Sequence, residues 1–376
     1  MTATVSEHLS VTLQSPGPLL FKPDVRPDGV AVLFASDVSA ATVFAAELPS
    51  EGSTAAGNGV QVAQLGVKLA ALLGVERQDV VIRGLAVHPV SHAVYLSIAR
   101  GRGAQAGPAL VRADPVGELT VVTLAGLPVT SFALDDAPTP DDERQDIWVD
   151  GTDENSEPRE YNGVHLDVAR VPLRRSTITG LAWVDGVLLI AGLSNEEFTS
   201  RLRQVPYPFD GSARGTSVEI YHVDHGRYET EAPIRSLIPF DGGAASVLAT
   251  YTCTPIAVFS VEDLRGETLV RGRTVAELGP MNQPFSLVSY DRDGQEYLLV
   301  SGTRHPLFKI PASSIAGQEP LAAPADRQNP RTFGIHREAL DYPGVTWMAS
   351  LDRGHVVVVQ NDGADIHLRT LAAAEL

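Results

Sequence analysis

The chain has 376 residues, of which 44% are hydrophobic and 20% are charged, and it carries a formal net charge of −17. This acidic balance argues against binding to nucleic acid or to an anionic membrane, because neutralising phosphate groups requires Lys and Arg. With 33 Gly and 26 Pro residues, the composition favours many short strands joined by tight turns over long helices.

The N-terminal stretch and the single cysteine bear on where the protein works. The first 21 residues lack a basic start followed by an apolar core, so no secretory signal is evident. No apolar stretch approaches the ~20 residues of a membrane span, and Cys253 cannot form an intrachain disulfide because it has no second cysteine. We therefore expect a cytoplasmic protein, and the use of Arg in place of Lys suggests a GC-rich bacterial genome.

Strand-like runs separated by turn residues begin near the N-terminus. The first group of four runs lies at 17–21, 30–36, 41–48 and 60–65. A second group lies at 84–88, 93–99, 109–113 and 119–124. Each run has the length of a typical strand, ~5–8 residues. A third group begins at 129–134 and is interrupted by a Pro- and Asp-rich segment.

The clearest hairpin signal lies in a fourth group. The runs 178–184 and 187–193 flank Asp185-Gly186, and Asp-Gly between two β-rich runs is the strongest short-range signal for a hairpin. The same pattern returns in three further groups, which begin near positions 235, 285 and 346. The pattern therefore predicts a repeat protein.

The first strands of the seven groups fall near positions 18, 84, 130, 179, 235, 285 and 346. A spacing of about 50 residues is the length of a four-stranded propeller blade. We predict an all-β chain that forms one β-propeller domain over residues 1–376, with seven four-stranded blades; six or eight are the alternatives. The alternating residues 8–14 are expected to complete the last blade and close the ring. Insertions are expected near 135–160, 196–215 and 316–332.

Two adjacent runs carry a resemblance to known proteins. Gly84-Leu85-Ala86-Val87-His88-Pro89 followed by Val94-Tyr95-Leu96-Ser97 resembles the blades of YVTN-type and gluconolactonase-like propellers, and the likeness of pattern extends over most of the chain. These folds host lactonases, lyases, dehydrogenases and non-catalytic scaffolds. The resemblance thus implies a propeller and leaves the activity open.

Propeller geometry predicts which loops would form a site. Loops that join second to third strands share one face with the connections between blades, so their polar side chains would gather at the mouth of the central channel. The residues expected to bind a small-molecule substrate there are Arg83, Arg100, Asn195, Asn282 and Arg304.

Four residues of the same loops are candidates for catalysis. Glu196 and Glu197 offer carboxylates for acid–base chemistry, or they are the solvated start of a loop. Cys253 would act as a nucleophile if His305 supplied a base, or it is a small buried apolar residue. His305 itself follows a strand at the position equivalent to that of Cys253 one blade earlier.

Histidines provide candidate metal ligands. His222 and His225 are three residues apart, which in a regular strand would place them on opposite faces, so joint ligation requires a turn between them. Gly226 makes such a turn plausible, and His88 is the candidate third ligand for a transition metal. The alternative is that the three histidines have separate structural roles. Carboxylates in the acidic segment 135–160 are candidate calcium ligands, although no helix-loop-helix calcium spacing is present.

Two functions remain open from the sequence. The first is an enzyme that acts on a small molecule, with or without the help of a metal and with the reaction type unresolved. The second is a non-catalytic propeller that binds a protein or a ligand. Polar side chains with shifted pKa values gathered at one place would favour the enzyme, whereas a flat apolar patch would favour the binding protein. The oligomeric state does not follow from the sequence.

Overall fold

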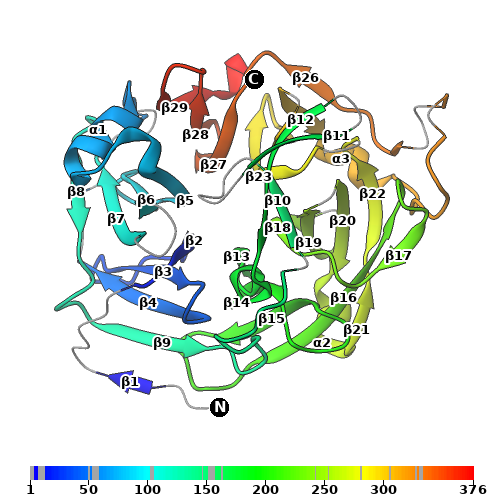
Figure 1. Cartoon of the computed structure of the whole chain (residues 1–376), viewed down its shortest axis with the longest axis horizontal. Coiled ribbons are helices and arrows are strands. Elements are labelled where there is room, and N and C mark those ends of the chain that lie inside the picture. The colour runs from blue at the N-terminus through cyan, green and yellow to red at the C-terminus, as the bar shows by residue number, and fades with distance from the viewer. Residues whose placement is uncertain are drawn as a thin grey trace. The chain divides into compact units, whose positions relative to one another are not determined.

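The computed structural model describes the chain except for residues 1–3, 7–12, 50, 53–58, 102–105, 146, 151–156, 162–163, 242, 253, 280–281, 305, 327 and 330–332. For the strand residues 4–6, 147–150, 157–161 and 164–168 only the backbone is described. The chain is an all-β β-propeller with six blades in its described residues, each built around antiparallel hydrogen-bonded strands (Figure 1). Among the described residues, no helix is both long and apolar enough to cross a membrane.

Most blades take their strands consecutively from the chain, whereas the first and the third each include a strand from further along it. The first blade contains β2 (Pro16–Phe21), β3 (Ala31–Asp37), β4 (Thr42–Leu48) and β9 (Val129–Ala133), with β1 (Thr4–Ser6) paired to β9. The second contains β5 (Val80–Val87), β6 (Val94–Arg100), β7 (Gly107–Ala113) and β8 (Leu119–Val122). The third contains β13 (Gly180–Val184), β14 (Val187–Leu193), β15 (Ser200–Pro206) and β16 (Arg214–His222), extended by β17 (Arg227–Glu229) and β21 (Leu269–Arg271).

The remaining blades are regular. The fourth contains β18 (Ile234–Asp241), β19 (Ala245–Tyr251), β20 (Pro255–Ser260) and β22 (Arg273–Glu277). The fifth contains β23 (Pro284–Arg292), β24 (Gln295–Gly302), β25 (Leu307–Pro311) and β26 (Glu338–Leu340), and the sixth β27 (Val345–Asp352), β28 (His355–Asn361) and β29 (Ile366–Ala372). A separate sheet has the order β10 (Ile147–Asp150), β12 (Val164–Val171), β11 (Glu157–Tyr161). The α-helices in the described part of the chain are α1 (Leu65–Leu73), α2 (Val261–Gly266) and α3 (Ala312–Ala316).

The chain divides into two compact units. Unit 1 comprises Met1–Ile178, Phe209–Gly211 and Val357–Thr370, and unit 2 comprises Thr179–Pro208, Ser212–Val356 and Leu371–Leu376. Unit 1 contains the first two blades, and unit 2 contains the third, fourth and fifth. In the sixth blade, the chain passes from one unit to the other once within β28 and again within β29.

The prediction of seven blades is wrong, because the third predicted group is not a blade. Its expected first strand is β9, which pairs with β4 as the fourth strand of the first blade. The whole second blade lies between β4 and β9 in the sequence, so an analysis that takes strands consecutively cannot pair them. The other six predicted first strands are confirmed as the first strands of blades.

Two other expected segments have different structures. Residues 60–65 do not form a fourth strand of the first blade: Val62 makes an isolated antiparallel bridge to Leu368 on β29, and α1 follows. Most of the expected closing strand 8–14 lies outside the described residues. In the expected insertion 196–215, residues 200–206 form β15, the third strand of a blade.

Alternating apolar residues build the core of unit 2. One cluster lies between the third and fourth blades and includes Leu189, Leu202, Tyr251 and Phe259. Burying a side chain of this size contributes roughly 1.5–3 kcal/mol. Polar contacts also join first strands of neighbouring blades: the Ser236 hydroxyl accepts a hydrogen bond from the backbone N–H of Leu287 at 3.1 Å.

Candidate metal centre

A tight turn in unit 2 brings two predicted metal ligands together. Strand β16 ends at His222 and β17 begins at Arg227, its cross-strand partner. The turn between them is closed by the Gly226 N–H, which donates to the His222 carbonyl at 2.8 Å. Gly226 has φ +64°, a left-handed conformation that glycine adopts without steric cost. The turn required for joint ligation by His222 and His225 is therefore present.

Glu229 completes a three-residue cluster with the two histidines. It pairs with Ile220 across the hairpin, and this register places its side chain on the same face as that of His222. His222 Nδ1 lies 2.9 Å from Glu229 Oε2, and His225 Nδ1 lies 2.6 Å from Glu229 Oε1. The two imidazole ring centroids are 3.8 Å apart. One carboxylate thus bridges both rings through their Nδ1 atoms.

A second carboxylate approaches His222 from the other side. Glu277, at the end of β22, has Oε1 3.6 Å from His222 Nε2. The Thr254 hydroxyl oxygen lies 3.3 Å from the same nitrogen. Glu277 is completely buried, and within the described part of the chain its Oε1 has no hydrogen-bond partner. His222, itself buried, therefore lies between two carboxyl groups.

The pKa values of Glu229 and Glu277 are shifted in opposite directions. Burial by itself would raise the pKa of Glu229, but hydrogen bonds from His222 and His225 outweigh it and hold the pKa at about 2. Burial raises the pKa of Glu277 to about 9, and repulsion from Asp224 and Glu229 adds to the effect. The site combines one ionised carboxylate with one carboxyl group that is protonated at neutral pH.

The donor set fits a transition-metal ion. One ligand atom from each of His222, His225 and Glu229 can be chosen so that all three lie within 4.8 Å of one another. Zn–N and Zn–O bonds of about 2.0–2.1 Å in a tetrahedral centre place ligand atoms about 3.4 Å apart. A bound ion would replace the hydrogen-bonding protons, and the ligand atoms, now 2.9 and 2.6 Å apart, would separate by about 0.5–0.8 Å. Two nitrogens and one oxygen suit zinc better than calcium, which prefers an all-oxygen shell.

The third predicted metal ligand has other partners. His88 is buried in unit 1, and its Nδ1 accepts hydrogen bonds from the backbone N–H groups of Val90 and Ser91 at 3.2 and 3.1 Å. Its ring packs edge-on against Phe21, with centroids 5.1 Å apart. His88 thus stabilises its own β5–β6 turn and does not belong to the His222 cluster.

The predicted catalytic residues are not brought together by the described structure. Glu196 and Glu197 are exposed, and Glu196 forms a 3.9 Å ion pair with Arg201 of its own blade. Cys253 and His305 lie outside the described residues. The catalytic roles of all four residues remain predictions.

The predicted substrate-binding residues fall in different surroundings. Asn195 is exposed, and Arg83 is half-buried on β5. Asn282 is buried and accepts a hydrogen bond from the Arg304 backbone N–H at 3.1 Å, so these two residues brace one loop.

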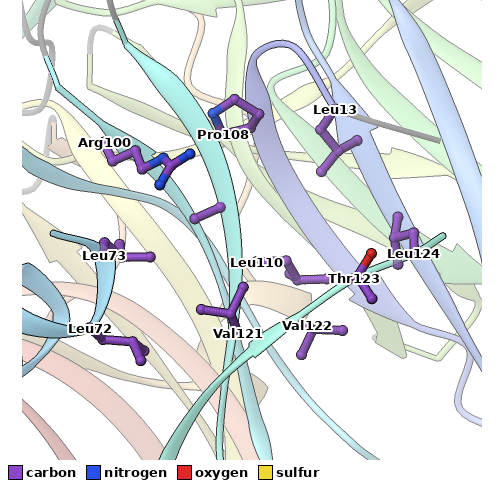
Figure 2. A pocket seen from close by; sticks show the side chains of 11 residues that line it. Leu13, Leu72, Leu73, Arg100, Pro108, Leu110, Val121, Val122, Thr123 and Leu124 are labelled. Atoms are coloured by element: carbon purple, nitrogen blue, oxygen red, sulfur yellow. The ribbon is translucent and has the colours of Figure 1, made fainter. Parts of the chain in front are cut away.

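Arg100, at the end of β6, lines an open pocket of about 280 Å³ in unit 1, most of whose lining side chains are apolar (Figure 2). The pocket is also lined by Leu13, Leu72, Leu73, Pro108, Ala109, Leu110, Val121, Val122, Thr123 and Leu124. Leu72 and Leu73 come from α1, whereas Leu110 comes from β7 and Val121 and Val122 from β8.

Sequence reasoning missed two residues of the cluster. Glu229 follows His225 by four positions, and the turn residue Gly226 between them was a usable signal, since a hairpin there brings the second strand back beside His222. Glu277 had no local signal, because it lies more than fifty residues further along the chain and reaches His222 only through the packing of neighbouring blades.

Comparisons with known proteins assign no family. No protein family and no curated protein matches the sequence. Among solved structures, the chain is similar to PorZ, a surface component of the type-IX secretion system of Porphyromonas gingivalis, with 10% identity and a TM-score of 0.38 over 99% of this chain. The chain spans 38% of the length of PorZ.

Two further structures are similar at the same level. The β-propeller domain of Cps50 (Swd1) from Myceliophteria thermophila shares 10% identity, with a TM-score of 0.38 over 95% of this chain and 83% of that one. Apo AztD from Citrobacter koseri shares 11% identity, with a TM-score of 0.30 over 96% and 69% of the two chains. These neighbours are diverse propellers, and functional conclusions for this protein rest on its own residues.

Proposed function

We propose that the protein binds one divalent transition-metal ion, with zinc as the first candidate, through His222, His225 and Glu229. The observation that supports this is the convergence of two imidazole nitrogens and one carboxylate on a single turn. Charge supports it as well, since the negative charges of Asp224 and Glu229 oppose ionisation of Glu277, and a cation would offset that repulsion.

The exposure of the His225 side chain indicates that an ion bound to the cluster would be accessible to solvent. The side chain of His225 is 48% exposed, whereas those of His222 and Glu229 are 1% and 5% exposed. Structural zinc sites are usually closed by four protein ligands, whereas catalytic sites have three and keep one position open. The described site has three ligand residues, one of which is half-exposed, and so resembles a catalytic zinc site with one open coordination position. We infer that the free position takes water or an oxygen donor of a small-molecule substrate, which makes a metal-assisted enzyme the favoured function.

The first test is zinc binding to the purified, untagged protein, measured by competition with a chromophoric chelator and by metal analysis. We expect one zinc ion per chain and a loss of binding of at least tenfold in His225→Ala and Glu229→Gln. The matched control is His355→Ala, because His355 pairs with Asp352 at 2.9 Å but belongs to no three-ligand group among the described residues. Wild-type protein that binds no zinc, or equal losses in the control, would refute the proposed site.

The second test asks whether a coordination position is open. In cobalt-substituted protein, azide should shift the visible absorption bands if an exchangeable position exists, because the small anion then enters the coordination shell. A spectrum that azide leaves unchanged would indicate a closed, structural centre and would remove the support for catalysis.

A second candidate function rests on the pocket beside Arg100. Its lining side chains are apolar except for those of Arg100 and Thr123 (Figure 2), which suits a small ligand with an apolar body and one carboxylate. This would make the protein a ligand-binding propeller independent of the metal centre. Octanoate is a suitable probe: calorimetry should show binding that Arg100→Gln weakens about tenfold. Equal heats for the variant and the wild type would refute this candidate.

A further inference from the structure

Glu277 is buried in a way that the fold alone does not require. Its side chain is 0% exposed, and Oε2 accepts a hydrogen bond from the Val223 N–H at 3.1 Å. Its Oε1 has no hydrogen-bond partner among the described residues. A buried polar group without a partner costs roughly 1–3 kcal/mol, so a role for this oxygen is worth seeking.

The unpartnered oxygen faces the one ring nitrogen of His222 that points away from Glu229. Oε1 lies 3.6 Å from Nε2, while Nδ1 lies 2.9 Å from Glu229. A neutral imidazole carries one proton, and the partner of one nitrogen determines where that proton lies. With Nδ1 donating to Glu229, Nε2 has no hydrogen to offer Glu277. When an ion occupies Nδ1, the proton must lie on Nε2, where it faces Glu277 Oε1 at 3.6 Å and the Thr254 hydroxyl oxygen at 3.3 Å.

We propose that Glu277 is the positioning residue of the metal centre: it accepts a hydrogen bond from the Nε2–H of His222 and so holds Nδ1 toward the ion. This inference rests on the proposed metal site, because the charge of a bound ion is what offsets the burial that otherwise keeps Glu277 protonated. Histidine ligands commonly donate their second N–H to a carboxylate, which fixes the tautomer and the ring orientation. Here the carboxylate comes from β22 and the histidine from β16, so two neighbouring blades of unit 2 hold the ligand.

The Val223 N–H makes the conservative variant Glu277→Gln informative. That N–H needs an acceptor, so the amide oxygen of the substituted side chain would face Val223 and its NH₂ group would face His222. An NH₂ donor favours the tautomer in which Nε2 is unprotonated and Nδ1 carries the proton, and this tautomer cannot bind the ion through Nδ1. The substitution therefore preserves side-chain volume while opposing ligation.

The experiment compares zinc affinities of the wild type, Glu277→Gln and the control Asp224→Asn. Asp224 is a charged neighbour of Glu277, so its neutralisation tests charge without touching the proposed hydrogen bond. We expect Glu277→Gln to weaken zinc binding 10–100-fold with unchanged stoichiometry, and Asp224→Asn to weaken it less than about threefold. Equal effects of the two substitutions, or less than a twofold effect of Glu277→Gln, would overturn the proposal.

A second measurement does not depend on how the variant folds. In the ¹⁵N-labelled wild-type protein, NMR of the His222 ring should show a proton on Nε2 in the zinc-bound state, with Nδ1 as the ligand atom. Ligation through Nε2 would refute the role of Glu277. Absence of zinc binding to the wild type would instead refute the proposed function itself, so the two failures are distinguishable.

Discussion

A partly buried carboxylate in unit 1 gives a quantitative prediction about stability. Glu51 accepts hydrogen bonds from the Tyr95 hydroxyl at 2.6 Å and from Arg112 Nε and Nη2 at 3.1 and 3.0 Å, and the Ser91 hydroxyl donates to it as well. Burial alone would raise its pKa, but these donors outweigh burial and lower the pKa from 4.5 to about 2. The ionised form of Glu51 therefore stabilises the folded chain.

The size of this contribution follows from the pKa. One pKa unit corresponds to about 1.4 kcal/mol, so the lowering is equivalent to about 3 kcal/mol. Because 17% of the side chain is exposed, we discount the value for solvent screening to about 2 kcal/mol. A carboxyl group whose pKa is lowered by folding stabilises the folded state at pH values above its unfolded-state pKa. The contribution is thus complete above about pH 5 and is lost as the pH falls from about 4.5 toward about 2.

The assay is urea unfolding of the wild type and Glu51→Gln at pH values between 7 and 2.5. We expect the variant to be less stable by about 2 kcal/mol at pH 7, with the difference shrinking steadily below pH 4.5. Other carboxyl groups titrate in both proteins and cancel in the comparison. Glu118→Gln, which alters an exposed carboxylate of the same unit, is the control and should show no such trend. A difference that stays constant from pH 7 to pH 2.5 would refute the reasoning.

Three further predictions concern the metal turn and the edge of β29. Arg227→Gln should tighten zinc binding about fivefold in chelator competition, because Arg227 donates to Glu229 at 3.1 Å and its charge repels the ion; weaker binding would contradict this. Gly226→Ala should lower the free energy of unfolding by about 1–2 kcal/mol, because φ is +64° and the added Cβ would lie 3.1 Å from Pro324; an unchanged urea midpoint would argue against a strained turn. Val62→Pro removes the N–H that donates to the Leu368 carbonyl at 2.8 Å and should lower the melting temperature by a few degrees; an unchanged melt would show that this pairing contributes nothing.

The sequence was a good guide wherever a signal was local. Alternating apolar runs and turn residues such as Asp185-Gly186 correctly predicted the all-β class and the hairpin β13–β14. They also located the first strand of each of the six blades. These features depend on side-chain alternation and turn geometry within about ten residues, which a single sequence displays directly.

Local signals also indicated part of the metal centre. The spacing of His222 and His225 showed that joint ligation requires a turn, the glycine that follows them made such a turn plausible, and the structure contains it. The inclusion of His88 rested on its place at the end of a first strand. That histidine accepts hydrogen bonds from its own turn instead, a contact that depends on the backbone path and not on spacing.

Long-range pairings were decided only by the tertiary structure. The fourth strand of the first blade is β9, which follows the entire second blade in the sequence, and this displaced strand accounts for the error in blade number. Glu277 likewise lies more than fifty residues from His222 in the sequence and reaches it only because their two blades pack together. The sequence determines which segments form strands and turns, because those choices are made by neighbouring residues. Which strand lies beside which, and hence which carboxylate faces which histidine, is determined by burial of the sheet faces, which only the folded chain satisfies.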